Sequence, residues 1–244
     1  MEPSGTSRDK EEAHHEHQQQ AAPQGSVDRR AGRGRAAGRR GRPMTRREQL
    51  TVLGQWLGLG AADLQRHIAW DPGARITAQH LSQMLDAPLV CATLSRLLLD
   101  LNRPIEAADS ITVHSEDTAI PGNIDLSDDE RRHRHAWIYT PFHEAVAALL
   151  AQRRAAGLPT AVISIHSFTP RYHDIARPWH VGVLSQHDRR LADQLLAQFR
   201  ADSALVVGDN QPYAPRDGVY HSMERHGEGN GLPCAMLGKP LQSP

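Results

Sequence analysis

The chain of 244 residues is long enough for one α/β domain with a hydrophobic core and an additional tail. Its formal net charge of zero gives no overall attraction to nucleic acid or to a membrane surface. Two cysteines exclude a disulfide framework, and no apolar run is long enough to cross a bilayer, so we expect a cytoplasmic protein.

Residues 1–48 differ in composition from the rest of the chain. They are rich in Glu, His and Gln and then in Arg and Gly, with few apolar residues. Because such a segment cannot offset the entropy of ordering, we predict a disordered tail over 1–48 and a folded domain over 49–244. The run from Arg29 to Arg47 suggests a basic arm for nucleic acid, but it lacks aromatic residues for base stacking. A solvated tail, or translated sequence upstream of a start near Met44, is the better interpretation, so we expect no nucleic-acid partner.

The first predicted elements of the folded part are short. Residues 53–68 are typical of a loop with a short helix. Asp71 followed by Pro72 predicts the start of a second helix, because Asp is a good N-cap and Pro is tolerated in the first turn. Apolar residues at helical spacing continue it: Ile76, Leu81, Met84 and Leu85. Apolar runs at 89–93 and 97–101 have the length of strands.

A long connection over 102–125 precedes the next helix, and a loop of this length is usually functional or mobile. Ser127 and Glu130 form a capping-box pattern, which predicts that a helix begins there. Pro141 is expected to kink or restart this helix, and Gly157 to end it. Three histidines on this polar helix are expected to face solvent: His133, His135 and His143.

Strands and helices alternate in the remaining sequence. We predict a buried strand from Thr160 that is broken at Thr169, a strand over 181–184, a helix over 185–200 and a strand over 204–207. A short helix around Met223 carries Glu224 and His226. This alternation predicts an α/β fold with a mostly parallel sheet and helices on both faces.

Polar residues gather where the predicted strands end. Ser164 and His166 are two residues apart and therefore project from the same side of a strand. Open α/β sheets bind ligands at the carboxyl ends of their strands, so we expect His166 to lie near Arg177 and near the Asp209–Asn210 pair. The alternative interpretation is a histidine with its hydrogen bonds satisfied in the core.

Several segments in chain order resemble the N-formylglutamate amidohydrolase family. They lie between Leu53 and Pro233 and are His67–Ala74, Ser95–Arg96, Asn102–Pro104, Ser164–Ser167, Arg177–Leu184 and Val206–Tyr213. The resemblance implies an α/β hydrolytic domain related to zinc carboxypeptidases, with a bound divalent metal, expected to be zinc. It also implies hydrolysis of the formamide of N-formyl-L-glutamate to formate and glutamate, a reaction of histidine degradation.

The expected metal ligand is His166, by resemblance to the family's Ser-x-His-Ser segment. Catalytic zinc sites usually take three protein ligands, and zinc lowers the pKa of bound water to ~7. Relatives carry an Asp-His-Ala-Ser-Asn-like strand where this chain has 46–50, and an acid-rich strand where it has 234–240. The ligand set is therefore interrupted, and we expect this chain to have little or no activity.

Candidate residues for the remaining roles follow from the same resemblance and from general chemistry. Arginine pairs with carboxylates in a bidentate manner, which suits a small-molecule N-acyl amino acid with two carboxylates. The substrate-binding candidates are Arg96, Asn102, Arg103, Arg177 and Asn210. Glu224 is the candidate base and His180 the candidate donor to an oxyanion, whereas Asp71 is interpreted as an N-cap and a solvated face remains the alternative for Glu224. The main alternative function is a non-catalytic remnant of the fold that binds a small anion.

Overall fold

The computed structural model describes residues 28–29 and 46–241. Most of the predicted tail, 1–48, therefore lies outside the described residues, and its predicted disorder remains a prediction. Helix α1 (Arg46–Leu57) begins before the expected domain boundary. The two-residue strand β1 (Asp28–Arg29) pairs in antiparallel orientation with β2 (Val90–Cys91).

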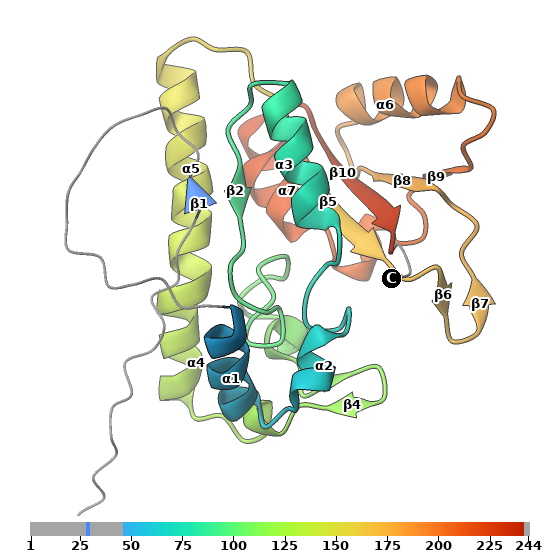
Figure 1. The fold of residues 1–244 in the computed structure, drawn as a ribbon. Coiled ribbons are helices and arrows are strands. Elements are labelled where there is room, and N and C mark those ends of the chain that lie inside the picture. Colours follow the sequence, from blue (N-terminus) through green and yellow to red (C-terminus); the bar gives the residue numbers. More distant parts are fainter. Residues whose placement is uncertain (1–27, 30–45, 242–244) are drawn as a thin grey trace, which may run out of the picture.

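A sheet of four strands forms the centre of the α/β fold (Figure 1). Its order is β5 (Val162–Phe168), β10 (Cys234–Pro240), β8 (Val181–Leu184) and β9 (Val207–Asp209). The pairs β5–β10 and β8–β9 are parallel, whereas β10 and β8 are antiparallel. The carboxyl ends of β5 and β10 therefore lie at one edge of the sheet, and those of β8 and β9 lie at the opposite edge.

Strand β10 was not predicted, although it occupies an interior position in the sheet. Its first residues Cys234 and Ala235 are fully buried, and side chains alternate between the two faces along it. Cys234 and Met236 pack with Met223 of α7 (His221–His226), and Ala235 packs with Leu196 of α6 (Arg190–Arg200). Helices α6 and α7 thus cover opposite faces of the sheet, as the α/β prediction required.

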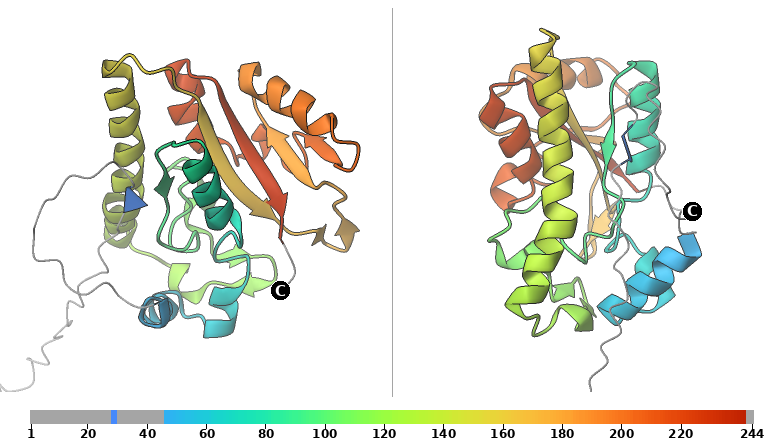
Figure 2. Two further views of the ribbon diagram at one scale, coloured as in Figure 1. Left: turned by 45° about the horizontal axis from the view of Figure 1, so that its top comes forward. Right: turned by 90° about the vertical axis from the view of Figure 1, so that its left-hand side faces the viewer.

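Helix α3 (Ala74–Met84) contacts β5 on the side opposite to α7 (Figure 2). Its predicted apolar stripe does not form a core face. Ile76 is 61% exposed, Met84 81% and the following Leu85 64%. The helix was therefore predicted correctly, but the prediction that its stripe marks the buried side was wrong.

The long helical segment begins at the predicted capping box. Ser127 accepts a hydrogen bond from the Glu130 amide, and the Glu130 carboxylate accepts one from the Ser127 amide. Helix α4 (Asp128–Arg134) continues through a π-helical turn, η3 (His135–Tyr139), into α5 (Thr140–Ala155). Pro141 lies in the first turn of α5, as the predicted restart required, and Gly157 follows the helix end with φ of +65°.

A second core lies under α1 and α2 (Ala61–Gln65) and contains the predicted strand 97–101. That prediction was wrong: Leu97, Leu98 and Leu99 are each 1% exposed, but they lie in a turn and the irregular segment that follows it. Three consecutive leucines can be buried here because side chains of the surrounding helices and loops enclose the turn on several sides.

The remaining elements are short and lie in the connections: η1 (Ala108–Ile111), β3 (His114–Ser115), β4 (Thr118–Ala119), η2 (Pro121–Asn123), β6 (Arg171–Tyr172), β7 (Ile175–Ala176), η4 (Pro215–Asp217) and η5 (Glu228–Asn230). Within the described ranges, no helix has the length and apolar character needed to cross a membrane.

Candidate functional site

His166 and Asp71 form the centre of the candidate site. His166 lies in β5, and its Nδ1 atom is 2.9 Å from Oδ2 of Asp71 in the segment before α3. The side chains are 26% and 17% exposed. Asp71 does not cap α3 with its side chain, because Gly73, with φ of +80°, is the N-cap residue. The interpretation of Asp71 as only an N-cap was therefore wrong.

The carboxylate of Asp71 also pairs with Arg96, whose Nη2 atom is 3.1 Å from Oδ1. Burial alone would raise the pKa of Asp71, but the hydrogen bond from His166, the charge of Arg96 and the Ser167 amide lower it to about 2. Burial likewise opposes the charge of Arg96, yet Asp71 and other acidic neighbours leave its pKa raised. Asp71 and Arg96 therefore both carry a charge at physiological pH.

The tautomer of His166 follows from this arrangement. A carboxylate with a pKa of about 2 accepts hydrogen bonds, so Nδ1 of His166 carries a proton and donates it to Asp71. Nε2 is then the basic nitrogen. An imidazole oriented in this way can accept a proton from water or bind a metal ion.

The residues do not fit a catalytic zinc site. In the part of the chain that the structure describes, no three His, Cys, Asp or Glu side chains are grouped so that they could hold a metal ion. His166 supplies one nitrogen, and Asp71 is engaged by both His166 and Arg96. Because catalytic zinc takes about three protein ligands, one free nitrogen is an incomplete set.

Arg177 lies beyond the carboxyl end of β5, where it was expected. Its Nη1 atom donates to the hydroxyls of Thr169 and Tyr213, each at 3.1 Å. The guanidinium carbon lies 4.7 Å from the ring centroids of both Tyr172 and Tyr213. The two hydroxyls and the two aromatic rings thus hold a cation near the end of the strand that carries His166.

The Asp209–Asn210 pair does not lie with His166, contrary to the prediction. Asp209 is aligned with Val183 of β8, and three strand spacings, about 14 Å, separate β9 from β5. Its carboxylate pairs with Arg189, and Asn210 Oδ1 accepts from the Ser185 amide at 3.0 Å. The prediction failed because β10 and β8 lie between β5 and β9, so Asp209 is level with Ile165 of β5 but three strands away from it.

Asn102 and Arg103 bind backbone groups of the segment before α7 and of the first turn of α7. Asn102 donates to the Val219 carbonyl and accepts from the Ser222 amide at 2.9 Å. Arg103 donates to the Asp217 carbonyl at 2.7 Å and pairs with Asp109. These contacts hold two segments together, and substrate binding by either residue remains a prediction.

The two candidate catalytic residues lie apart from the Asp71 pair. The His180 Nδ1 atom accepts from the Val206 amide at 2.8 Å, at the start of the β8–β9 pairing. Glu224 is exposed on α7. Their predicted roles gain no support from the geometry, since neither has a contact with His166 in the described structure.

A buried histidine cluster is the feature that sequence reasoning missed. His143, expected to face solvent, is 2% exposed, and its Nδ1 atom is 2.7 Å from Nε2 of His226. Tyr139 Oη is 2.6 Å from Nε2 of His221 and accepts from Arg225 at 3.0 Å. Burial, followed by neighbouring positive charge, lowers the pKa of His143 to about 3 and that of His226 to about 4. The four-residue spacing of Tyr139 and His143 was the available signal, because it places both on one helix face.

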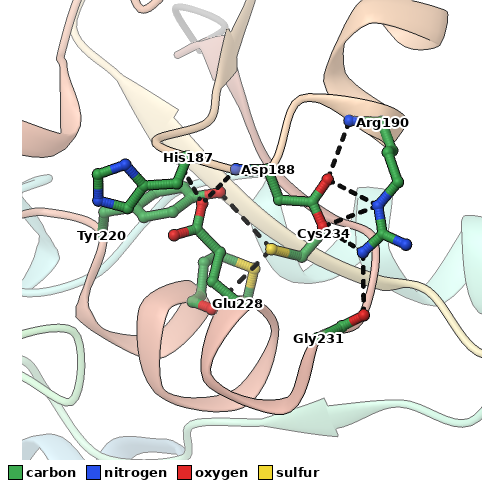
Figure 3. Close-up of polar contacts among 8 residues, drawn as sticks. His187, Asp188, Arg190, Tyr220, Glu228, Gly231 and Cys234 are labelled. Atoms are coloured by element: carbon green, nitrogen blue, oxygen red, sulfur yellow. Dashed lines mark hydrogen bonds and ion pairs between the residues drawn. The ribbon is translucent and has the colours of Figure 1, made fainter.

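A further polar cluster connects the turn after β8 to η5 (Figure 3). Glu228 accepts from the amides of His187 and Asp188 at 3.0 and 3.2 Å, and Asp188 pairs with Arg190. The buried thiol of Cys234 is 3.7 Å from the Tyr220 hydroxyl. These contacts join chain segments around the start of β10, and none of them involves Asp71, Arg96 or His166.

The chain is similar to known proteins over most of its length. A family model described as N-formylglutamate amidohydrolase matches residues 47–238. A crystal structure of a gene product from Agrobacterium tumefaciens shares 43% identity and a TM-score of 0.74, covering 77% of this chain and 74% of that one. An N-formylglutamate amidohydrolase from Ralstonia eutropha JMP134 shares the fold, with 16% identity, a TM-score of 0.53 and 69% coverage of each chain. No curated protein matches the chain.

Proposed function

The chain belongs to the N-formylglutamate amidohydrolase family, and from this premise we propose that it is an amide hydrolase whose site is the cluster of Asp71, Arg96 and His166. Its substrate would be N-formyl-L-glutamate or a related N-acyl amino acid. The products of the first would be formate and glutamate. The observation that carries the proposal is the hydrogen bond between Asp71 and His166, which leaves Nε2 of the imidazole as a base.

His166 and Asp71 would act together on the attacking water. Nε2 takes a proton as the water oxygen adds to the formyl carbon, and the Asp71 carboxylate stabilises the imidazolium that forms. The same proton then passes to the leaving nitrogen as the carbon–nitrogen bond breaks. One water is consumed, and one carboxylic acid and one amine are released.

Arg96 would stabilise the negative charge that develops on the substrate during the reaction. Its Nη2 atom pairs with Asp71, but 39% of its side chain is exposed, so its other guanidinium donors would be accessible to a ligand. Such a donor stabilises the oxyanion of the tetrahedral intermediate. Zinc, which the resemblance implies, would polarise the carbonyl, but the described side chains offer an incomplete ligand set and no step is assigned to it.

A non-catalytic remnant that binds a small anion is the second candidate. The incomplete ligand set favours it, because general-base catalysis alone contributes about 10²–10⁴-fold in rate, far less than most enzymes achieve. Arg96 and Arg177 would still bind carboxylates in this form. We therefore expect slow turnover or none.

Formate release from N-formyl-L-glutamate tests the proposal, with and without added zinc. His166→Ala is compared with His133→Ala, since His133 is exposed on α4 and far from β5 in sequence. Formate release that is lost in His166→Ala and retained in His133→Ala supports hydrolysis at this site. No formate release by the unaltered chain, together with saturable binding of the substrate, supports the remnant instead.

A further inference from the structure

Three glycines lie in one row with His166 across the central sheet. The strand register pairs His166 with Gly238, Gly238 with Gly182, and Gly182 with Gly208. Residues that are paired in this way project from the same face of a sheet. Because glycine has no side chain, another part of the chain can approach the sheet closely along this row, on the face from which the His166 ring projects.

The segment after β9 crosses the sheet at this row. A Cβ atom added to Gly182 would lie 2.2 Å from the carbonyl oxygen of Gln211. Tyr213, two residues later in the chain, packs on the same hydrophobic cluster as Val162 of β5. Val162 and His166 are four residues apart on this strand and so share a face. The Tyr213 ring therefore lies on the His166 face of the sheet.

The hydroxyl of Tyr213 is directed to the carboxyl end of β5. It accepts a hydrogen bond at 3.1 Å from Nη1 of Arg177, and the same nitrogen donates to the hydroxyl of Thr169, three residues after His166. Tyr213 also acts electrostatically on Arg96, which belongs to the proposed site. The phenol thus lies between the Arg177 guanidinium and that site.

The proton of the Tyr213 hydroxyl is available to a ligand. Since the phenol oxygen accepts from Arg177, its own O–H bond points in another direction, and within the described ranges no acceptor receives it. A hydrogen bond from a charged guanidinium also polarises the hydroxyl and strengthens it as a donor. Tyr213 therefore presents an oriented donor on the side of the sheet where His166 would activate water.

We propose that Tyr213 is a catalytic residue that donates a hydrogen bond to the oxyanion of the tetrahedral intermediate formed beside His166. The phenol keeps its proton throughout, so His166 alone carries the proton from water to the leaving nitrogen. Arg177 is the positioning residue that orients the phenol. Donors from Tyr213 and Arg96 would then converge on one oxyanion. The assignment rests on the proposed function, because it takes His166 as the position of the attacking water.

Calorimetric titration with two ligands tests the assignment. N-formyl-L-glutamate has a planar, uncharged reacting group, whereas 2-(phosphonomethyl)pentanedioate carries a tetrahedral, anionic phosphonate in place of the formamide. We expect Tyr213→Phe to weaken phosphonate binding at least about tenfold and binding of the formyl compound less than about twofold, because only the phosphonate presents the oxyanion.

Tyr172→Phe is the matched control. The Tyr172 ring lies 4.7 Å from the same Arg177 guanidinium carbon, but its hydroxyl forms no hydrogen bond in the part of the chain that the structure describes. Loss of this hydroxyl should leave both affinities unchanged. Equal weakening of both ligands by Tyr213→Phe would show that Tyr213 only positions Arg177 and would overturn the assignment. Weakening of neither ligand, or no phosphonate binding by the unaltered chain, would overturn it as well.

Incorporation of 3-fluorotyrosine at position 213 is the second test, and it applies even if Tyr213→Phe fails to fold. Fluorine makes the phenol proton more acidic and therefore a stronger donor, so the phosphonate should bind more tightly than to the unaltered chain. Equal or weaker binding would contradict the proposed hydrogen bond.

Formate release from N-formyl-L-glutamate is measured separately. If the unaltered chain turns over, Tyr213→Phe should lower kcat at least about tenfold and change KM less than about twofold, since the interaction is made only in the transition state. A raised KM with unchanged kcat would assign Tyr213 to substrate binding and overturn the proposal. No formate release, with the phosphonate result intact, would refute hydrolysis and leave Tyr213 as a donor to a tetrahedral anion.

Discussion

Asp71 and His166 are 95 residues apart in the chain, yet their side chains meet at 2.9 Å. The contact depends on α3 packing against β5, which brings the segment before the helix to the strand. Arg96 then completes the arrangement by pairing with the second carboxylate oxygen of Asp71. Tertiary packing of three distant segments therefore creates the acid–base pair.

Replacing Asp71 by Asn should change how stability depends on acid. The pKa of Asp71 is about 2 in the folded protein, below its ordinary value of 3.8. The carboxylate therefore contributes fully to the free energy of unfolding above about pH 4, and this contribution is lost as the pH falls toward 2. The shift corresponds to about 2 kcal/mol. Urea unfolding near pH 3 and pH 5 should show a smaller difference for Asp71→Asn than for the unaltered chain. Asp117→Asn, at an exposed position, is the control, and equal pH dependence in all three proteins would refute the assignment.

The buried pair of His143 and His226 should make the fold sensitive to mildly acidic pH. Both pKa values are lowered, so the folded state keeps these rings neutral while the unfolded chain binds protons below about pH 6.5. Stability is then full above about pH 6.5 and declines toward pH 4, by up to about 1.4 kcal/mol per pH unit for each histidine. His143→Gln should flatten this decline in urea unfolding between pH 7 and pH 5. The exposed His133→Gln should retain it; a steep decline in His143→Gln would contradict the prediction.

Asn123 should be among the polar residues most important for stability. It is fully buried, donates to the carbonyls of Leu97 and Thr112 at 2.7 and 2.6 Å, and accepts from Arg134 at 2.6 Å. Asn123→Ala leaves buried polar groups without partners, and we expect a loss of about 2–4 kcal/mol in the free energy of unfolding. The same substitution at exposed Asn230 should cost less than about 1 kcal/mol. Similar losses at both positions in denaturant titrations would show that burial is not the cause.

Gly182 should not tolerate a side chain. A Cβ atom added there would lie 2.2 Å from the Gln211 carbonyl oxygen, which is backbone and cannot rotate away. Gly182→Ala should therefore lower the free energy of unfolding by about 2 kcal/mol or more, because the strand and the crossing segment must separate. Gly60 is the control: its φ is −74°, an added Cβ would meet only the Asp63 carboxylate at 3.9 Å, and its Ala variant should lose less than about 1 kcal/mol. Equal melting temperatures for the two variants would contradict this account.

Sequence patterns correctly predicted the structural features that depend on residues close together in the chain. The strand 181–184 was predicted with its observed bounds, and the capping box at Ser127 was confirmed in both of its hydrogen bonds. Strand 234–240 was missed, because its small and apolar residues fit an interior position that only the pairing with β5 and β8 defines. In the candidate site, His166 followed from the end of a strand. Asp71 did not, because its role depends on a partner 95 residues away.

The reversal of direction between β10 and β8 also determines where the chain can vary in length. The connection over 156–161 leads into the amino end of β5, and the turn over 185–189 follows the carboxyl end of β8. The antiparallel register brings both to the edge away from the carboxyl end of β5. At 156–161, Leu158 is 49% exposed and Gly157 has nothing within 4 Å of an added Cβ. A reporter group or an affinity sequence can therefore be inserted in this connection without contacting the Asp71 cluster. For the same reason, insertions that arise here during evolution are not constrained by the geometry of that site.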